Sequence, residues 1–201
     1  MSTLFENYTS TNTPYDAEIG ISTWGDIYWA TQTFTPTVSH SITSVNLLLS
    51  GLALAGYPPG TITVGIRVTS SGLPTGGDIT SGTTNGNTLG LTYEWRAITL
   101  TSYALTMGTV YAIVCRCTGT GSEGALPLHW SGDSAGTYSG GTFVLSIDNG
   151  VTWAANVATD LHFQEWGDAV AVVKRGIWIE GTAFKYFDST GTERSIVGDL
   201  V

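Results

Sequence analysis

Residues 61–68 read Thr-Ile-Thr-Val-Gly-Ile-Arg-Val, and this stretch decides the fold class. Every second residue from Ile62 to Val68 is a branched aliphatic residue, and threonine, glycine and arginine lie between them. Because successive side chains of a strand point to opposite faces of a sheet, the pattern predicts a strand with one buried face. Segments rich in glycine and proline, at 57–60 and 70–78, are turns that bound this strand.

Runs of the same kind recur along the chain between clusters of turn residues, about ten in all. In 41–50 the apolar residues from Ile42 to Leu49 mostly alternate with polar ones, which indicates a half-buried strand. Residues 140–155 read as a hairpin that turns at 148–150. Further strands are predicted in 31–34, 95–100 and 106–117.

Neither a helical period nor an internal repeat interrupts this pattern. Many short strands with glycine-rich turns are typical of sandwiches and barrels, and the missing repeat disfavours a propeller. We therefore expect an all-β chain that forms an antiparallel β-sandwich, with a jelly roll as the best-fitting topology.

The charge distribution suggests a boundary near residue 168. The last 35 of the 201 residues hold 4 basic and 5 acidic side chains, which leaves 3 basic and 11 acidic for the rest. We expect a sandwich domain at 1–168 and a short β-meander at 169–201 that serves in packing or oligomerisation. The meander is too short for a core of its own. Its apolar residues should pack on another chain or on the sandwich: Ile177, Ile179, Phe184 and Tyr186.

Composition excludes several classes of function. Hydrophobic residues make up 42% of the chain and charged residues only 11%, against a usual value of about 25%. The net charge of -9 has the wrong sign for binding phosphate backbones or an acidic membrane surface, so neither nucleic acid nor a membrane is an expected partner.

The start of the chain and its cysteines suggest assembly in the cytosol. The N-terminus has no basic segment followed by an apolar one, and no apolar run approaches 18 residues, so neither export nor membrane spanning is expected. Cys115 and Cys117 are two positions apart in a strand-like run, which places both on one face as reduced thiols.

One local motif is distinctive. Ser146, Asp148, Gly150, Thr152 and Trp153 match the Asp-box pattern S-x-D-x-G-x-T-W. In this pattern the serine and aspartate bond to turn amides, the glycine takes a positive φ and the tryptophan packs over the hairpin. We interpret the motif as a structural hairpin, and a direct ligand role is the alternative. A single copy does not make a sialidase, in which the box recurs from blade to blade.

Catalytic motifs give no basis for an enzyme. The histidines His40, His129 and His162 lack the spacing of a zinc site, and nucleophile-elbow, P-loop and dinucleotide motifs are missing from the sequence. We expect no catalytic residues, no metal ligands and no cofactor, with calcium left open. Paired carboxylates of a glycoside hydrolase would meet only in the fold. The candidates for such a pair are Asp133, Asp148, Asp160 and Glu165.

Aromatic residues are the better functional lead. Seven Trp and nine Tyr exceed what one core of this size needs, and exposed aromatic faces can stack on sugar rings. One cluster lies at 24–29, and a second flanks a glycine-rich loop. We predict glycan contact at the second cluster, through Trp130 and Tyr138 with support from Asp133. The alternative is that most of these rings lie in the core or at subunit interfaces.

The order of the blocks resembles a family of non-catalytic, jelly-roll β-sandwich modules, similar to carbohydrate-binding modules, that occur in bacterial surface proteins and phage virion proteins. The resemblance covers roughly residues 29–153 and rests on the segments 29–36, 41–50, 58–82, 105–119 and 138–153. The segment 177–198 is similar to short terminal β-meanders of phage structural proteins.

The resemblance implies a structural protein of a tailed-phage virion, either a capsid decoration or a tail- or fibre-associated subunit. Its partners would be other virion proteins, copies of itself and host surface polysaccharide. For the copies, a trimer is the first expectation. The alternatives are a free-standing carbohydrate-binding module, the accessory domain of a glycan-active enzyme, and a glycan-degrading enzyme.

Overall fold

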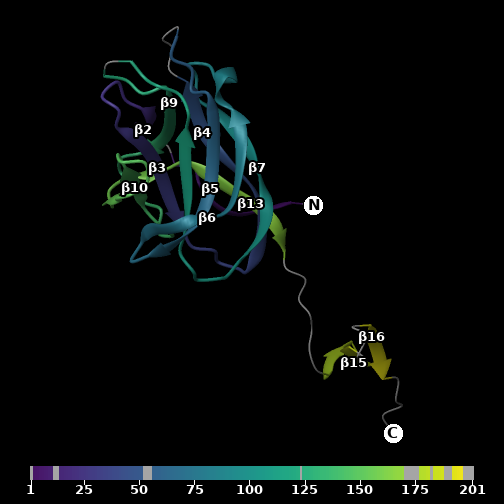
Figure 1. Ribbon diagram of the computed structural model, residues 1–201. Helices are drawn as coiled ribbons and strands as arrows, with labels where there is room; N and C mark the ends of the chain where they lie inside the picture. The colour runs from purple at the N-terminus through teal and green to yellow at the C-terminus, as the bar shows by residue number, and fades with distance from the viewer. Residues whose placement is uncertain are drawn as a thin grey trace. The chain divides into compact units, whose positions relative to one another are not determined.

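The computed structural model of the 201-residue chain is all-β (Figure 1). The chain forms two compact units, a body that ends at Ala169 and a C-terminal unit, and each is described by itself below. One 3-10 turn, Gly86–Thr88, interrupts the strands of the described part. The structure describes residues 2–10, 14–51, 56–122, 124–169, 177–181, 183–187 and 192–196.

The body is one strongly curled sheet whose two halves face each other, and its strand pairs are antiparallel, as predicted. The first half holds β1 (Thr3–Tyr8), β13 (Phe163–Ala169), β4 (His40–Gly51), β7 (Glu94–Leu105), β9 (Leu128–Asp133), β12 (Asp160–Leu161) and β2 (Pro14–Ile21). The second half holds β3 (Ile27–Phe34), β8 (Tyr111–Cys117), β5 (Thr61–Ser70), β6 (Leu73–Asn85), β10 (Phe143–Ser146) and β11 (Ala154–Asn156).

The halves are joined by a narrow link between β2 and β3. Only two residue pairs, Gly20 with Tyr28 and Ile21 with Ile27, connect these strands before the chain turns. The strand order along the sheet is β1-β13-β4-β9-β2-β3-β8-β5-β6. The antiparallel sandwich character agrees with the sequence analysis, whereas the jelly-roll topology remains a prediction.

Strand β5 buries the face that its sequence predicts. Ile62, Val64 and Ile66 are fully buried between the halves, but Val68 is 38% exposed. The pairing of β5 with β6 shifts register between Ile66 and Val68, so the last aliphatic residue lies beyond the bulge.

A bulge also explains the imperfect alternation in β4. Ile42 and Val45 are three residues apart, yet both are fully buried. The register of β4 against β7 shifts between Ile42 and Ser44. In a regular strand, residues three positions apart point to opposite faces. The extra residue in the bulge turns the Val45 side chain back toward the core.

Both cysteines lie on β8 and are free thiols, as expected. They are buried, and burial raises the pKa of both thiols, that of Cys117 to about 11. These residues therefore act as small apolar core groups.

The C-terminal unit is a three-stranded antiparallel sheet of β14 (Ile177–Glu180), β15 (Ala183–Phe187) and β16 (Glu193–Ile196). Ile179 pairs with Phe184, and these side chains are 68% and 40% exposed. Tyr186 is half-buried, and the side chain of Ile177 lies outside the described ones. Within the C-terminal unit itself Ile179 and Phe184 are thus exposed, and their packing on another chain or on the sandwich remains a prediction.

Candidate functional site

The predicted glycan site at Trp130, Tyr138 and Asp133 is wrong. Trp130 is fully buried, and its indole Nε1 donates a 2.8 Å hydrogen bond to the carbonyl oxygen of His162. Along β9, Leu128 and Trp130 share the inward face of the strand, so the ring belongs to the core. A fully buried ring cannot stack on a sugar.

The other two members of that prediction are structural as well. Asp133 is fully buried and accepts hydrogen bonds from the Tyr8 hydroxyl at 3.2 Å and the Ala135 amide at 2.8 Å. Tyr138 packs edge-on against Phe163, with ring centroids 5.4 Å apart. These contacts hold the loop after β9 onto the core.

Asp160 belongs to the same buried network. It lies opposite Asp133 in the pairing of β12 with β9 and accepts bonds from Gln32 Nε2 and the Tyr138 amide, at 3.0 and 2.9 Å. Burial raises the pKa of its carboxyl group. Among the described residues, no group of three or more His, Cys, Asp and Glu side chains is placed to hold a metal ion.

Glu165 forms a separate buried pair with His40. Both side chains are fully buried, and His40 Nε2 lies 2.9 Å from each carboxylate oxygen of Glu165. The ring of Phe5 stacks on the imidazole at 3.7 Å. Burial raises the pKa of Glu165 to about 7, although the hydrogen bond and charge of His40 lower it. No solvent reaches this pair. Because Phe5, His40 and Glu165 come from β1, β4 and β13, their contacts hold these three strands together.

The segment 146–153 is a tight loop between β10 and β11. The Asp148 carboxylate accepts bonds from the Thr152 amide and hydroxyl at 2.8 and 2.5 Å, and Ser146 Oγ accepts one from the Gly150 amide at 2.8 Å. Gly150 has a φ of +78°, and Trp153 packs against Trp29 with centroids 6.3 Å apart. The side chains of this loop are therefore occupied in holding its own backbone.

An exposed aromatic side chain lies instead at the turn between β2 and β3. Trp24 is 81% exposed. The Ser22 amide donates to the Asp26 carbonyl oxygen at 2.8 Å, and the Asp26 amide donates to Ser22 Oγ at 3.0 Å. The Gly25 amide donates to the Ser22 carbonyl oxygen at 3.1 Å, and these three bonds close the turn. Gly25 has a φ of +90°, which a residue with a side chain rarely adopts. The turn therefore holds Trp24 outward on a defined backbone.

The wall opposite Trp24 comes from the loop after β8. The Ile21 amide donates to the Gly119 carbonyl oxygen at 3.0 Å, and the Ile21 carbonyl oxygen accepts from the Gly121 amide at 2.8 Å. These two bonds fix the loop to the end of β2. A β-carbon at Gly121 would lie 2.1 Å from the Ala125 carbonyl oxygen, which shows how tightly the loop folds. Backbone contacts therefore fix both walls.

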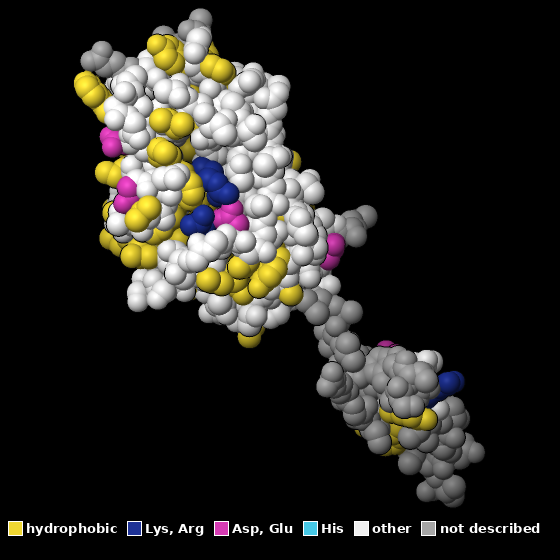
Figure 2. Space-filling view, viewed as in Figure 1, with side chains coloured by type: hydrophobic (Ala, Val, Ile, Leu, Met, Phe, Trp, Pro, Cys, Tyr) yellow, Lys and Arg dark blue, Asp and Glu magenta, His cyan; other side chains and the backbone are white. Residues whose placement is uncertain are grey.

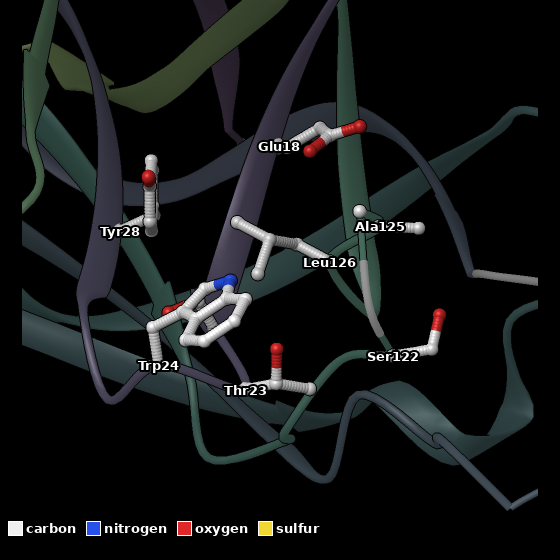
Figure 3. A pocket seen from close by; sticks show the side chains of 9 residues that line it. Glu18, Thr23, Trp24, Tyr28, Ser122, Ala125 and Leu126 are labelled. Carbon is white, nitrogen blue, oxygen red and sulfur yellow. The ribbon is translucent and has the colours of Figure 1, made fainter.

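A pocket of about 240 Å³ lies between these walls. Figure 3 shows Trp24, Tyr28, Glu18 and Ser122 arranged around the side chain of Leu126. Glu18 extends from β2, and Tyr28 extends from β3. The described residues that line the pocket are Glu18, Ser22, Thr23, Trp24, Tyr28, Ser122, Gly124, Ala125 and Leu126. Aromatic rings, hydroxyl groups and one carboxylate thus meet in one open depression.

A second surface cluster surrounds Trp29. The guanidinium carbons of Arg67 and Arg116 lie 5.2 and 4.9 Å from the Trp29 ring, and Asp78 bonds both arginines, at 2.7 and 2.5 Å. Figure 2 shows basic and acidic side chains gathered beside hydrophobic ones on this face of the body. A pocket of about 300 Å³ lies next to Trp29 and Arg116. Because Asp78 already pairs with both cations, this cluster is a weaker candidate for a ligand site.

Comparison of the chain with known protein families, with curated proteins and with solved structures finds no match. Within the described part of the chain, no helix has the length and apolar character needed to cross a membrane.

Sequence reasoning identified the aromatic cluster at 24–29 but ranked it below Trp130. A usable signal was present. Trp24 lies in Ser-Thr-Trp-Gly-Asp, a run of turn residues between two strands, whereas Trp130 continues the alternation of an apolar strand. The turn context favours exposure, and the alternation favours burial.

Proposed function

We propose that this chain is a non-enzymatic structural protein on the outside of a tailed-phage virion, a capsid decoration or a tail- or fibre-associated subunit. The C-terminal sheet serves in assembly with copies of the chain and with other virion proteins. The β-sandwich body is presented outward and attaches to host surface glycans. The observation that carries the assembly role is the exposed pair of large apolar side chains, Ile179 and Phe184, on one face of the C-terminal sheet.

One face of that sheet carries large apolar side chains, with Arg194 beside them at the register position opposite Tyr186. Ile179 and Phe184 are opposite each other in the register, and Tyr186 lies two positions further along β15 on the same face. Exposing large apolar side chains side by side favours association, because burial of apolar surface is worth about 25 cal/mol per Å².

The other face, the charged face, carries an ion-pair cluster, and two aromatic residues also take register positions on it. Lys185 Nζ lies 2.6 Å from a carboxylate oxygen of Glu193 and 3.8 Å from one of Glu180. Strand alternation places these three residues opposite to Ile179 and Phe184. Large apolar side chains exposed together on a sheet face are typical of an element that packs on a partner.

Net charge also supports self-association through this unit. From residue 170 onward the chain holds 4 basic and 4 acidic residues, whereas the complete chain carries -9. Copies of the C-terminal unit therefore meet without net repulsion, while the acidic bodies repel one another.

The test is the mass of the full-length chain in solution. We expect light scattering of the wild type to give a multiple of the 21.2 kDa chain mass, and Ile179→Asp/Phe184→Asp to give a single chain. Ser195→Asp is the matched control, because Ser195 pairs with Lys185 on the charged face, and it should assemble like the wild type. A wild type that remains monomeric at every concentration, or a double variant that assembles normally, would contradict the assembly role.

A monomeric wild type that binds sugar would instead favour the second candidate, a free-standing carbohydrate-binding module. The pocket beside Trp24 is the specific observation that favours it.

A further inference from the structure

We infer that the pocket beside Trp24 binds one uncharged pyranose ring of a glycan. This inference deepens the glycan attachment in the proposed function by naming the site and the class of sugar, and it does not depend on the assembly role. It rests on the exposure of Trp24, on the polar lining of the pocket and on the sign of its charge.

Trp24 has the geometry of a stacking platform. Its side chain is 81% exposed, and the hydrogen bonds of the Ser22–Asp26 turn hold its backbone. A ring this exposed adds little to the core, so it is available to a ligand. The C–H faces of a pyranose are apolar and flat enough to cover an indole ring. Prior ordering of the turn lowers the entropy cost of binding.

The lining supplies hydrogen-bond partners for sugar hydroxyl groups. The Glu18 carboxylate can accept, and the hydroxyls of Ser22, Thr23 and Ser122 can donate or accept. Ser22 Oγ already accepts the Asp26 amide at 3.0 Å, which fixes its position and leaves its proton to be donated. The pocket volume of about 240 Å³ lies below the roughly 300–1,000 Å³ of sites for drug-sized ligands, so a single ring fits.

The charge of the pocket selects against acidic sugars. Glu18 is the one ionisable carboxylate among the described lining residues, and lysine and arginine do not occur among them. The complete chain carries a net charge of -9. A uronate or sialate carboxylate would meet Glu18 without a cation to offset the repulsion. Neutral hexoses and N-acetylated hexosamines avoid this penalty.

A quaternary ammonium is the competing ligand, because cations also bind aromatic faces beside a carboxylate. The three hydroxyl side chains favour sugar, since a trimethylammonium group has no N–H or O–H to bond with them and choline brings a single hydroxyl, whereas a pyranose brings several. Choline binding is therefore an outcome of the test that would overturn the inference.

The experiment titrates full-length protein with the methyl pyranosides of glucose, galactose, mannose and N-acetylglucosamine, and with glucuronate and choline. Binding is followed at the indole N–H resonances. We expect at least one neutral pyranoside to shift the Trp24 resonance saturably. Trp24→Ala should weaken binding about tenfold or more with an unchanged melting temperature. Trp95→Ala is the matched control, because Trp95 is a 40% exposed tryptophan on β7, and it should bind like the wild type.

Several results would overturn the inference: no saturable binding of any neutral pyranoside, tighter binding of glucuronate or choline, or equal losses in Trp24→Ala and Trp95→Ala. Failure here is distinguishable from failure of the assembly role. Trp24→Ala should retain the wild-type mass, and Ile179→Asp/Phe184→Asp should retain binding of a monosaccharide, because the two variants change different units of the chain.

Discussion

His40 shows how hydrogen-bonding rules fix a proton in the core. Its Nδ1 lies 2.8 Å from the Val38 carbonyl oxygen, which only accepts, so Nδ1 carries a proton. Its Nε2 lies 2.9 Å from both oxygens of Glu165, and that contact needs one further proton, on the ring or on the carboxyl group. The nearby carboxylate of Glu6, bonded by the Thr37 amide and hydroxyl, adds negative charge to this region.

This pair predicts that stability falls as pH rises from about 4.5 to about 7. Burial raises the pKa of Glu165 from 4.5 to about 7. The stabilising contribution of the bound proton is therefore complete below pH about 4.5 and lost as pH rises through about 7. We expect the free energy of unfolding to fall by roughly 2–3 kcal/mol between pH about 5 and about 9 from this group.

Urea denaturation across that pH range measures the effect. Glu165→Gln retains a side-chain N–H that can donate to His40 and removes the titrating carboxyl group, so its stability should lack this pH dependence. Glu18→Gln, at an exposed carboxylate on β2, is the control and should follow the wild type. A wild type and a Glu165→Gln variant with the same pH dependence would exclude the pair as its source.

At the same scale, the tryptophans mark the limit of sequence reasoning. The number of aromatic residues is visible in the sequence, but their exposure depends on strand phase and on turn geometry. Trp130 donates to the His162 carbonyl 32 residues away, a contact that no local pattern contains. Trp24 is exposed because its turn is closed by local bonds, which its neighbouring turn residues did indicate.

Among the elements, β6 and β7 show how the edges of the curled sheet approach each other. A β-carbon on Gly82 in β6 would lie 1.9 Å from the Thr99 carbonyl oxygen in β7, and the Thr80 hydroxyl donates to the Thr101 carbonyl oxygen. Glycine is required here because the two backbones are close. This contact protects strand edges that would otherwise pair with other chains.

Substitution of this glycine tests the contact. We expect Gly82→Ala to lower the free energy of unfolding by about 1–3 kcal/mol, because β6 and β7 must separate to admit the methyl group. Gly77→Ala is the control on the same strand, since a β-carbon there meets nothing within 4 Å, and it should change stability by less than about 0.5 kcal/mol. Equal effects of the two substitutions in thermal or urea unfolding would contradict the close approach.

The strands also show which features local sequence predicts and which depend on long-range pairing. The aliphatic alternation in 61–68 was sufficient to predict β5, and the broken phase between Ile42 and Val45 was visible as an irregularity in 41–50. That a bulge corrects this phase, and that β4 pairs with β7, β9 and β13, follows only from the long-range pairing. Residues 41 to 50 carry no information about their partners.

For the whole molecule, sequence pattern was a sound guide to fold class, and composition was a poor guide to sites. Alternating apolar runs between glycine-rich turns predicted an all-β chain, which the structure confirms. The pocket beside Trp24 combines residues from two strands, their turn and a loop about 100 positions later, so it exists only in the fold. The C-terminal strands were predictable because the alternation of their side chains is local. The surface on which they pack cannot be predicted from local sequence.

Hydrogen–deuterium exchange of the full-length chain, at low and at high protein concentration, tests the central claim that the C-terminal sheet is an assembly surface. We expect the amides of β14, β15 and β16 to exchange more slowly at high concentration, because association buries the face that carries Ile179 and Phe184. The turn that presents Trp24 should exchange equally fast at both concentrations. Identical exchange of the three C-terminal strands at both concentrations would contradict the claim.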